Sequence, residues 1–207
     1  MDGIQRALKP SLVGHGFRAR GRTFNRVTAD GLTQVVNLQM GSSDPPGTTY
    51  IPGLRENFHG LFTINLGVYV PEDSELRRGL AKAWVQVHDC CIRSRLGQTS
   101  GSPQDIWWQA RNETTVVADV QSMLLSFGLL FLDRFASRDQ ILSELEGCGA
   151  NEEHCNVPRI VSAIILCRRG ETDAARALMA AQTHETLNRN HPAYVRELAL
   201  RMGLGEI

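Results

Sequence analysis

The sequence contains no signature of a known catalytic or metal site. It has no Gly-rich phosphate loop, no serine elbow and no paired-carboxylate motif. Its five cysteines lack the spacing of a disulfide framework, which favours reduced thiols, and none matches a zinc knuckle. We therefore expect neither a cofactor nor a metal. A catalytic site assembled from separate strands would leave no local trace, so catalysis itself is not excluded.

An excess of charge of either sign is also missing. The 22 basic and 22 acidic residues cancel, so the overall charge favours neither nucleic acid nor a membrane surface as a partner. Lysine is scarce, because only Lys9 and Lys82 are lysines and the other basic residues are arginines. Residues 1–40 hold six basic and two acidic residues. This local excess keeps nucleic-acid binding through the arginine-rich first strand as an alternative function.

The sequence shows neither an export signal nor a convincing membrane span. No basic-then-apolar leader is visible at the start of the sequence. The longest apolar run, Val116–Phe135, is interrupted by polar residues that include Asp119 and Asp133, and is interpreted as too polar for a spanning helix. We therefore expect a cytoplasmic protein without membrane association.

Period-two alternation is the strongest pattern that is present. In Leu61–Pro71, LFTINLGVYVP, apolar residues alternate with polar ones or glycine, which predicts a strand with one dry and one wet face. The Asp30-Gly31 pair predicts a hairpin. Other strands are predicted at Phe17–Val27 with a bulge near Gly21, at Leu32–Met40, at His88–Leu96 and at Ile106–Gln109. A break rich in Gly, Pro and Ser, residues 41–60, separates the second strand from the third.

Helical periodicity surrounds these strands. Apolar residues at helical spacing predict helices over Met1–Val13 and Glu72–Val87, and from Glu113 onward the rest of the chain is predicted to be helical. The prediction is an α+β protein with a five-stranded, mostly antiparallel sheet and helices packed on one face. Residues 1–112 would form the sheet domain, and residues 113–207 a helical C-terminal region packed on it as one unit.

The order of short motifs resembles a bacterial family. The segments are R-x-F-x-R at Arg22–Arg26, then VVNLQMGSS, then FTINLGVYVP, then a strand with two arginines ahead of a Trp-Trp pair. This order resembles the family catalogued as domain of unknown function 4304, over roughly residues 1–145. The resemblance implies a fold but no activity, and it assigns no functional residue.

Strand parity predicts one polar surface. If the dry faces pack on the helices, the opposite face gathers arginines, amides and an aromatic side chain, which together suit an anionic or polar partner. Trp107 and Trp108 point opposite ways, and Trp108 is assigned to this surface. An exposed polar sheet face can also serve solubility alone. The predicted binding residues are Arg18, Arg20, Asn37, Gln39, Asn65, Tyr69, Arg93, Arg95 and Trp108.

Three functions are compatible with this surface. The leading prediction is a non-enzymatic module that binds another protein through the polar face and the 41–60 loop, in an accessory or immunity-type role suggested by analogy. The alternative is a hydrolase-like enzyme for a polar or anionic substrate, held by the same arginines and amides, with His59 or His88 as the titrating group. Nucleic-acid binding is the third.

Overall fold

The computed structural model describes residues 1–41, 58–111, 114–148, 155–184 and 190–207. One antiparallel sheet of six strands runs in the order β1-β2-β3-β4-β5, and β6 pairs with β4 beside this path. The α+β prediction is confirmed, with six strands in place of five because the first predicted strand is divided into β1 and β2. The strands are β1 Arg18–Arg20, β2 Thr23–Val27, β3 Thr33–Met40, β4 Leu61–Tyr69, β5 Ile92–Arg95 and β6 Trp108–Gln109.

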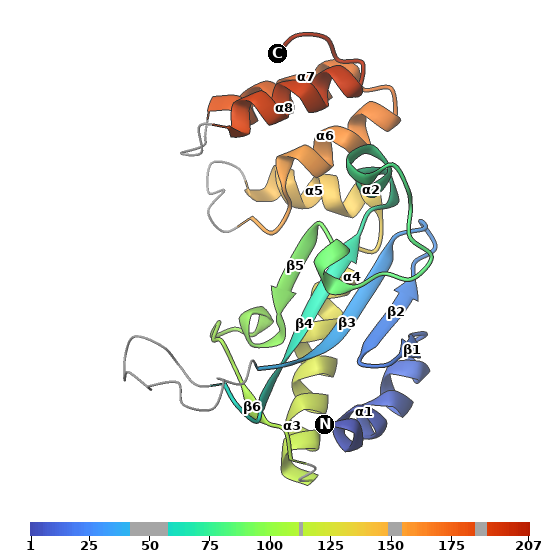
Figure 1. The fold of residues 1–207 in the computed structure, drawn as a ribbon, viewed down its shortest axis with the longest axis vertical. Helices are drawn as coiled ribbons and strands as arrows, with labels where there is room; N and C mark the ends of the chain where they lie inside the picture. Colours follow the sequence, from blue (N-terminus) through green and yellow to red (C-terminus); the bar gives the residue numbers. More distant parts are fainter. Residues whose placement is uncertain (42–57, 112–113, 149–154, 185–189) are drawn as a thin grey trace.

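The helices form a layer behind the sheet and a stack above it (Figure 1). A π-helical turn, Leu124–Gly128, joins α3 and α4 into one long helix that crosses the back of the sheet with α1 beside it. Helices α5 to α8 stack beyond the end of the sheet, next to α2. The helices are α1 Asp2–Gly14, α2 Pro71–Arg78, α3 Thr114–Met123, α4 Leu129–Asp133, α5 Arg138–Cys148, α6 Arg159–Arg168, α7 Thr172–His184 and α8 His191–Arg201.

The main core lies between the sheet and the long helix. Ile64 and Leu66 of β4 are fully buried, and they belong to the same cluster as Leu8 of α1 and Val120 and Leu124 of the long helix. Burial of each such aliphatic side chain is worth about 1.5–3 kcal/mol. A second cluster of apolar side chains holds α6, α7 and α8 together. The apolar residues of β4 therefore face the core, as the period-two alternation predicts.

The first predicted strand is two strands. Gly21, at φ +58°, turns the chain between β1 and β2, which pair as an antiparallel hairpin with Arg20 opposite Thr23 and Ala19 opposite Phe24. The predicted bulge near Gly21 is therefore wrong. In a continuous strand Phe24 would lie on the same face as Arg18 and Arg20. The reversal at Gly21 instead places Phe24 on the core face, where it is fully buried.

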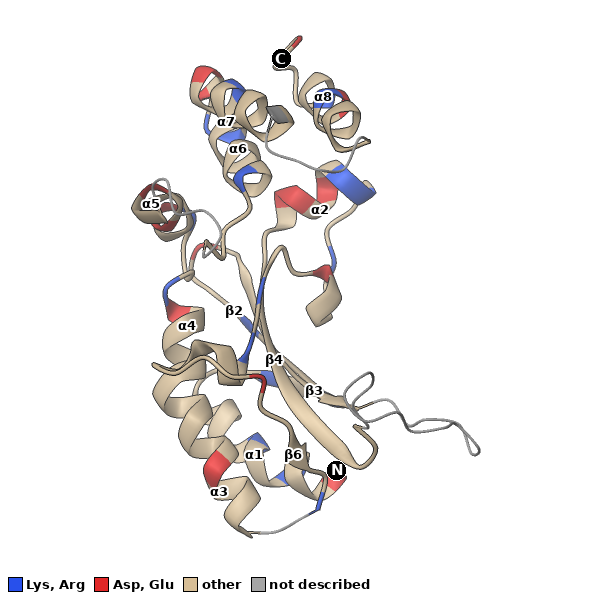
Figure 2. Ribbon diagram, turned by 90° about the vertical axis from the view of Figure 1, so that its left-hand side faces the viewer, with Lys and Arg blue, Asp and Glu red and all other residues tan. Residues whose placement is uncertain are grey.

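The helix predicted over Glu72–Val87 ends at Arg78. Gly79 adopts a left-handed conformation, φ 78°, which closes α2 after two turns. The segment that follows, residues 79–91, crosses the polar face of the sheet, on the side opposite the long helix (Figure 2). Gly67 of β4 permits this approach, because a Cβ there would come within 2.6 Å of the Cys90 sulfur. The polar face is therefore partly covered by a largely non-helical segment, which the sequence pattern does not predict.

The long helix, Thr114–Asp133, meets the length and composition of a membrane-crossing helix, although its sequence is interpreted above as too polar. The core helix of a soluble protein meets the same criterion. Here Val120, Leu124 and Leu132 lie in the main core against the sheet. The outer side of this helix carries little charge (Figure 2).

Arg138, at the start of α5, ties the helical stack to the sheet. Its guanidinium donates two hydrogen bonds to Glu72 of α2, at 2.6 and 2.8 Å, and its backbone N–H donates to Asp30 in the β2–β3 turn at 2.7 Å. Two parallel N–H···O bonds give the pair a fixed geometry. This arginine therefore joins the C-terminal helices to two separate parts of the sheet domain.

The prediction of reduced thiols is wrong for one pair of cysteines. Cys148 at the end of α5 and Cys155 are joined by a disulfide, while Cys90, Cys91 and Cys167 are free. A single bond between cysteines seven residues apart leaves no framework pattern in the sequence.

Candidate functional site

The strand register brings the predicted polar residues onto one face. Arg20, Thr23, Asn37, Asn65 and Arg95 are successive cross-strand partners, one from each of β1 to β5. Arg93 lies on the same face, opposite Gly67. Residues that are directly paired in neighbouring strands point to the same side of a sheet. The period-two prediction of a shared polar face is therefore correct for these positions.

Segment 79–91 removes Tyr69 from the exposed surface. Tyr69 is only 2% exposed, and its hydroxyl accepts a hydrogen bond from the backbone N–H of Lys82 at 2.8 Å. It packs in a small cluster with Val35, Val85 and Cys90. Tyr69 therefore anchors the covering segment, and its predicted role as a contact for a partner is wrong.

Four of the predicted residues converge on one hollow in the uncovered half of the face. Gln39, Asn65, Arg93 and Arg95 line a pocket of about 370 Å³ together with Val87, His88, Ser94 and Gln98. The Asn65 amide donates to the Gln39 side-chain oxygen at 2.7 Å, which orders both amides. Asn37 is a neighbour of Asn65 across the strands but does not line the pocket, and its amide donates to Thr23 at 2.9 Å.

The two arginines of the pocket differ in their partners. The Arg95 guanidinium donates to both carboxylate oxygens of Asp105, each at 2.5 Å, and lies 5.2 Å from the Trp107 ring. The Arg93 side chain is exposed, and its guanidinium has no hydrogen-bonding or ion-pair partner among the described residues. Arg93 is therefore the side chain of this pocket whose charge is available to an incoming anion.

The assignment of the two tryptophans is reversed. Trp108 is 7% exposed and packs in the main core, where its indole N–H donates to Asp119 at 2.7 Å. Trp107 lies at the rim of the polar face, stacked on Phe58 with ring centroids 4.3 Å apart. Trp108 pairs with Phe62 of the dry face, so the register of β6 decides which tryptophan is buried.

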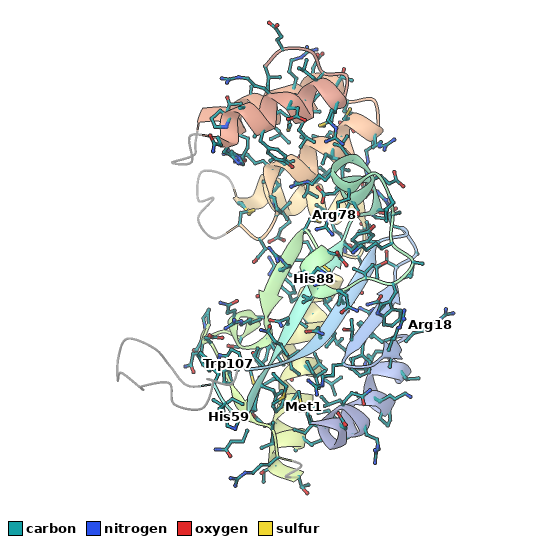
Figure 3. The ribbon with its side chains drawn as sticks, in the orientation of Figure 1. Met1, Arg18, His59, Arg78, His88 and Trp107 are labelled. Carbon is teal, nitrogen blue, oxygen red and sulfur yellow. A yellow bond between two sulfur atoms is a disulfide. The ribbon has the colours of Figure 1, made fainter. Side chains whose placement is uncertain are left out.

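Arg18 and Arg20 lie at the other edge of the sheet. They belong to β1, which is four strand spacings from β5, so they stand about 19 Å from Arg95. Figure 3 shows Trp107 toward one side of the sheet, His88 in front of its middle and Arg18 projecting from the opposite edge. These two arginines share the face with the pocket but do not belong to it.

The titratable groups beside the pocket are poorly arranged for catalysis. His88 is exposed, and its Nε2 lies 3.6 Å from Asp89 Oδ1, but that oxygen already binds Arg78 and Lys82 at 2.5 and 2.7 Å. Cys91 lies outside the pocket and packs against the main core, where burial raises the pKa of its thiol to about 12, so this thiol stays protonated at neutral pH and is a weak nucleophile.

Sequence reasoning did not identify Gln98, Val87 or Trp107 as part of the site. Gln98 follows β5, and its side chain accepts a hydrogen bond from the Arg95 N–H at 3.1 Å. Such a contact outside a strand leaves no alternating pattern in the sequence. Val87 belongs to a 3₁₀ turn, Val87–Asp89, within the region predicted as helix and strand. Most of the 41–60 loop, residues 42–57, lies outside the described residues, so its predicted role stays a prediction.

Comparisons with known proteins identify no relative. Scans of protein-family models, curated proteins and solved structures found no match to this chain. The resemblance to the family described above therefore stays a prediction.

Proposed function

We propose that this chain is a non-enzymatic protein-binding module that holds an acidic segment of another protein in the pocket around Arg93. The observation that carries the proposal is the exposed Arg93 guanidinium, which has no partner among the described residues and stands in a pocket with the amides of Gln39 and Asn65. A guanidinium with free N–H groups binds a carboxylate through paired hydrogen bonds.

The surroundings of Arg93 favour a peptide over a compact substrate. Among the described residues that line the pocket, none is acidic, and His88 is the one histidine. The stacked Trp107 and Phe58 lie close to Arg95 and offer an apolar contact for a neighbouring side chain. The Asp89 carboxylate is already paired with the side chains of Arg78 and Lys82. His88 therefore lacks a free carboxylate to orient it as a general base. Binding is therefore supported better than hydrolysis.

Fluorescence anisotropy with labelled peptides tests this function. The probe is a fluorescein-labelled octapeptide rich in glutamate, and a lysine-rich octapeptide of the same length is its control. The acidic peptide should bind with an affinity that falls as salt is added, and Arg93→Glu should weaken binding at least about tenfold. Arg18→Glu is the matched control, because Arg18 is also exposed and unpaired among the described residues. Equal binding of both peptides, or equal losses in both variants, would contradict the proposal.

The accessory or immunity-type role and the cytoplasmic location belong to the same proposal. Disulfides rarely persist in a reducing cytoplasm, so the Cys148–Cys155 bond provides a check of location. Mass spectrometry after rapid alkylation of protein in its native cells should find both thiols modified if the chain is cytoplasmic. An unmodified, oxidised pair would contradict that location.

A further inference from the structure

A second cleft lies beside β5, against the long helix. The π-helical turn Leu124–Gly128 forms part of its wall, and π turns occur frequently at functional sites. Gly128 lets the helix approach the 3₁₀ turn Leu96–Thr99, because a Cβ on Gly128 would lie 2.9 Å from a methyl of Leu96. Phe127, within the π turn, is 38% exposed and faces this cleft.

One side of the cleft is apolar. Phe127, Leu130 and Phe131 line it from the long helix, and Leu130 is 62% exposed. The cleft has a volume of about 670 Å³, within the range of sites that hold small organic molecules. A cleft of this volume with one apolar wall suits a hydrocarbon chain or ring.

Apart from Pro103 and Cys155, the other described lining residues are polar or positively charged. Ser94, Gln98, Thr99, Ser100 and Asn156 supply hydrogen-bonding groups, and Arg93 and Arg134 supply two cations. None of the described lining residues is acidic. Arg134 pairs with Glu144, which does not line the cleft, while Arg93 has no partner among the described residues. The net charge of the described lining is therefore positive.

We infer that this cleft binds a small organic anion with an apolar body, an aliphatic or aromatic carboxylate of about ten carbon atoms. The carboxylate would be held by Arg93 and Arg134, and the hydrocarbon would lie on Phe127, Leu130 and Phe131. Arg93, Ser94 and Gln98 also line the pocket on the polar face, so the two hollows adjoin at β5. The inference itself does not require the proposed peptide binding.

Isothermal titration calorimetry of the full chain with decanoate and decanol tests this site. The two probes share one hydrocarbon chain and differ in the carboxylate. Decanoate should bind with one-to-one stoichiometry and at least about tenfold more tightly than decanol, as expected for charge-assisted hydrogen bonds. Equal affinities for the two probes, or no saturable binding of decanoate, would overturn the inference.

Variants locate the binding and separate it from the peptide pocket. Arg134→Gln and Leu130→Asn should each weaken decanoate binding about tenfold, and both residues are exposed, so the fold tolerates the changes. Leu200→Asn is the matched control, because Leu200 is 58% exposed on α8 and lies outside the cleft. Asn65→Ala should leave decanoate affinity unchanged, since Asn65 lines only the polar-face pocket. Loss in Leu200→Asn equal to that in Leu130→Asn, with both variants folded by circular dichroism, would overturn the site.

Discussion

Asn25 and Val85 are joined by two hydrogen bonds. The Asn25 amide donates to the Val85 carbonyl at 3.0 Å and accepts from the Val85 N–H at 2.9 Å. Both residues are buried, so a side chain of β2 satisfies the backbone of the covering segment as a neighbouring strand would. This contact fixes the covering segment to the sheet, and the same segment contributes Val87 and His88 to the lining of the pocket.

Asn25→Ala should therefore loosen one wall of the pocket. The change leaves the buried N–H and C=O of Val85 without partners, which should lower the free energy of unfolding by about 2–3 kcal/mol. Chemical denaturation measures this loss. Asn37→Ala is the control, because it removes one hydrogen bond from a half-buried side chain and should cost about 1 kcal/mol. Equal losses in the two variants would contradict the anchoring role of Asn25.

The Asp89 carboxylate should make stability depend on pH in acid. Burial raises its pKa, but hydrogen bonds from Lys82, the Gln86 N–H and Arg78 outweigh burial, so the pKa lies below its ordinary value. A lowered folded pKa adds stability that is complete above the unfolded pKa of about 3.9 and is lost as pH falls through the folded value. Asp89→Asn should lower the free energy of unfolding at pH 7 by about 1–3 kcal/mol.

Thermal unfolding of the two proteins between about pH 2 and pH 7 checks this prediction. The difference in midpoint between the native protein and Asp89→Asn should be constant near neutrality and shrink below about pH 4. A difference that grows as the pH falls would contradict the lowered pKa of Asp89.

Substitution of the two adjacent tryptophans should destabilise the protein to different extents. Trp108→Ala empties a core position and removes the partner of Asp119, so it should cost about 3–5 kcal/mol. Trp107→Ala loses a surface stack with Phe58 and should cost about 1 kcal/mol. Chemical denaturation measures both losses, and the midpoints of the two variants can be compared directly if their m-values are unchanged. A larger loss for Trp107→Ala would show that the register of β6 is assigned wrongly.

Arg138 should hold the helical stack against the sheet domain. Arg138→Ala leaves the buried Glu72 carboxylate without its cation, which should cost about 3 kcal/mol. Arg168→Ala is the matched control, since Arg168 and Glu75 form a pair that is about half exposed on both sides and should cost less than about 1 kcal/mol. Hydrogen exchange should rise in α5 and α2 in the first variant only. Unchanged exchange there would show that other contacts carry this junction.

Period-two patterning predicted the sheet well because both faces of β4 obey it. Ile64 and Leu66 lie in the core, and Asn65 lies beside Gln39 on the polar face, as parity requires. The alternation shows which residues share a face of the sheet, but it does not show which segment covers that face. The crossing of segment 79–91 depends on Gly67, whose missing side chain makes room for Cys90, and on the end of α2 at Gly79.

The site was predicted in part for the same reason. Gln39, Asn65, Arg93 and Arg95 come from three neighbouring strands, so alternation alone places them together. Trp108 was misassigned because β6 has only two paired positions, and a one-residue difference in register exchanges the faces of two adjacent tryptophans. Tyr69 was misassigned because its burial depends on a tertiary contact with Lys82, which no local pattern encodes.

Chemical-shift mapping by NMR tests the central claim most directly, because it locates the binding of an acidic peptide without assuming which residues matter. Titration of the ¹⁵N-labelled chain with the glutamate-rich octapeptide should shift the side-chain resonances of Gln39, Asn65 and Arg93 and the backbone amides of residues 93–98. Shifts confined to β1 around Arg18 and Arg20, or none at saturating peptide, would contradict a binding site centred on Arg93.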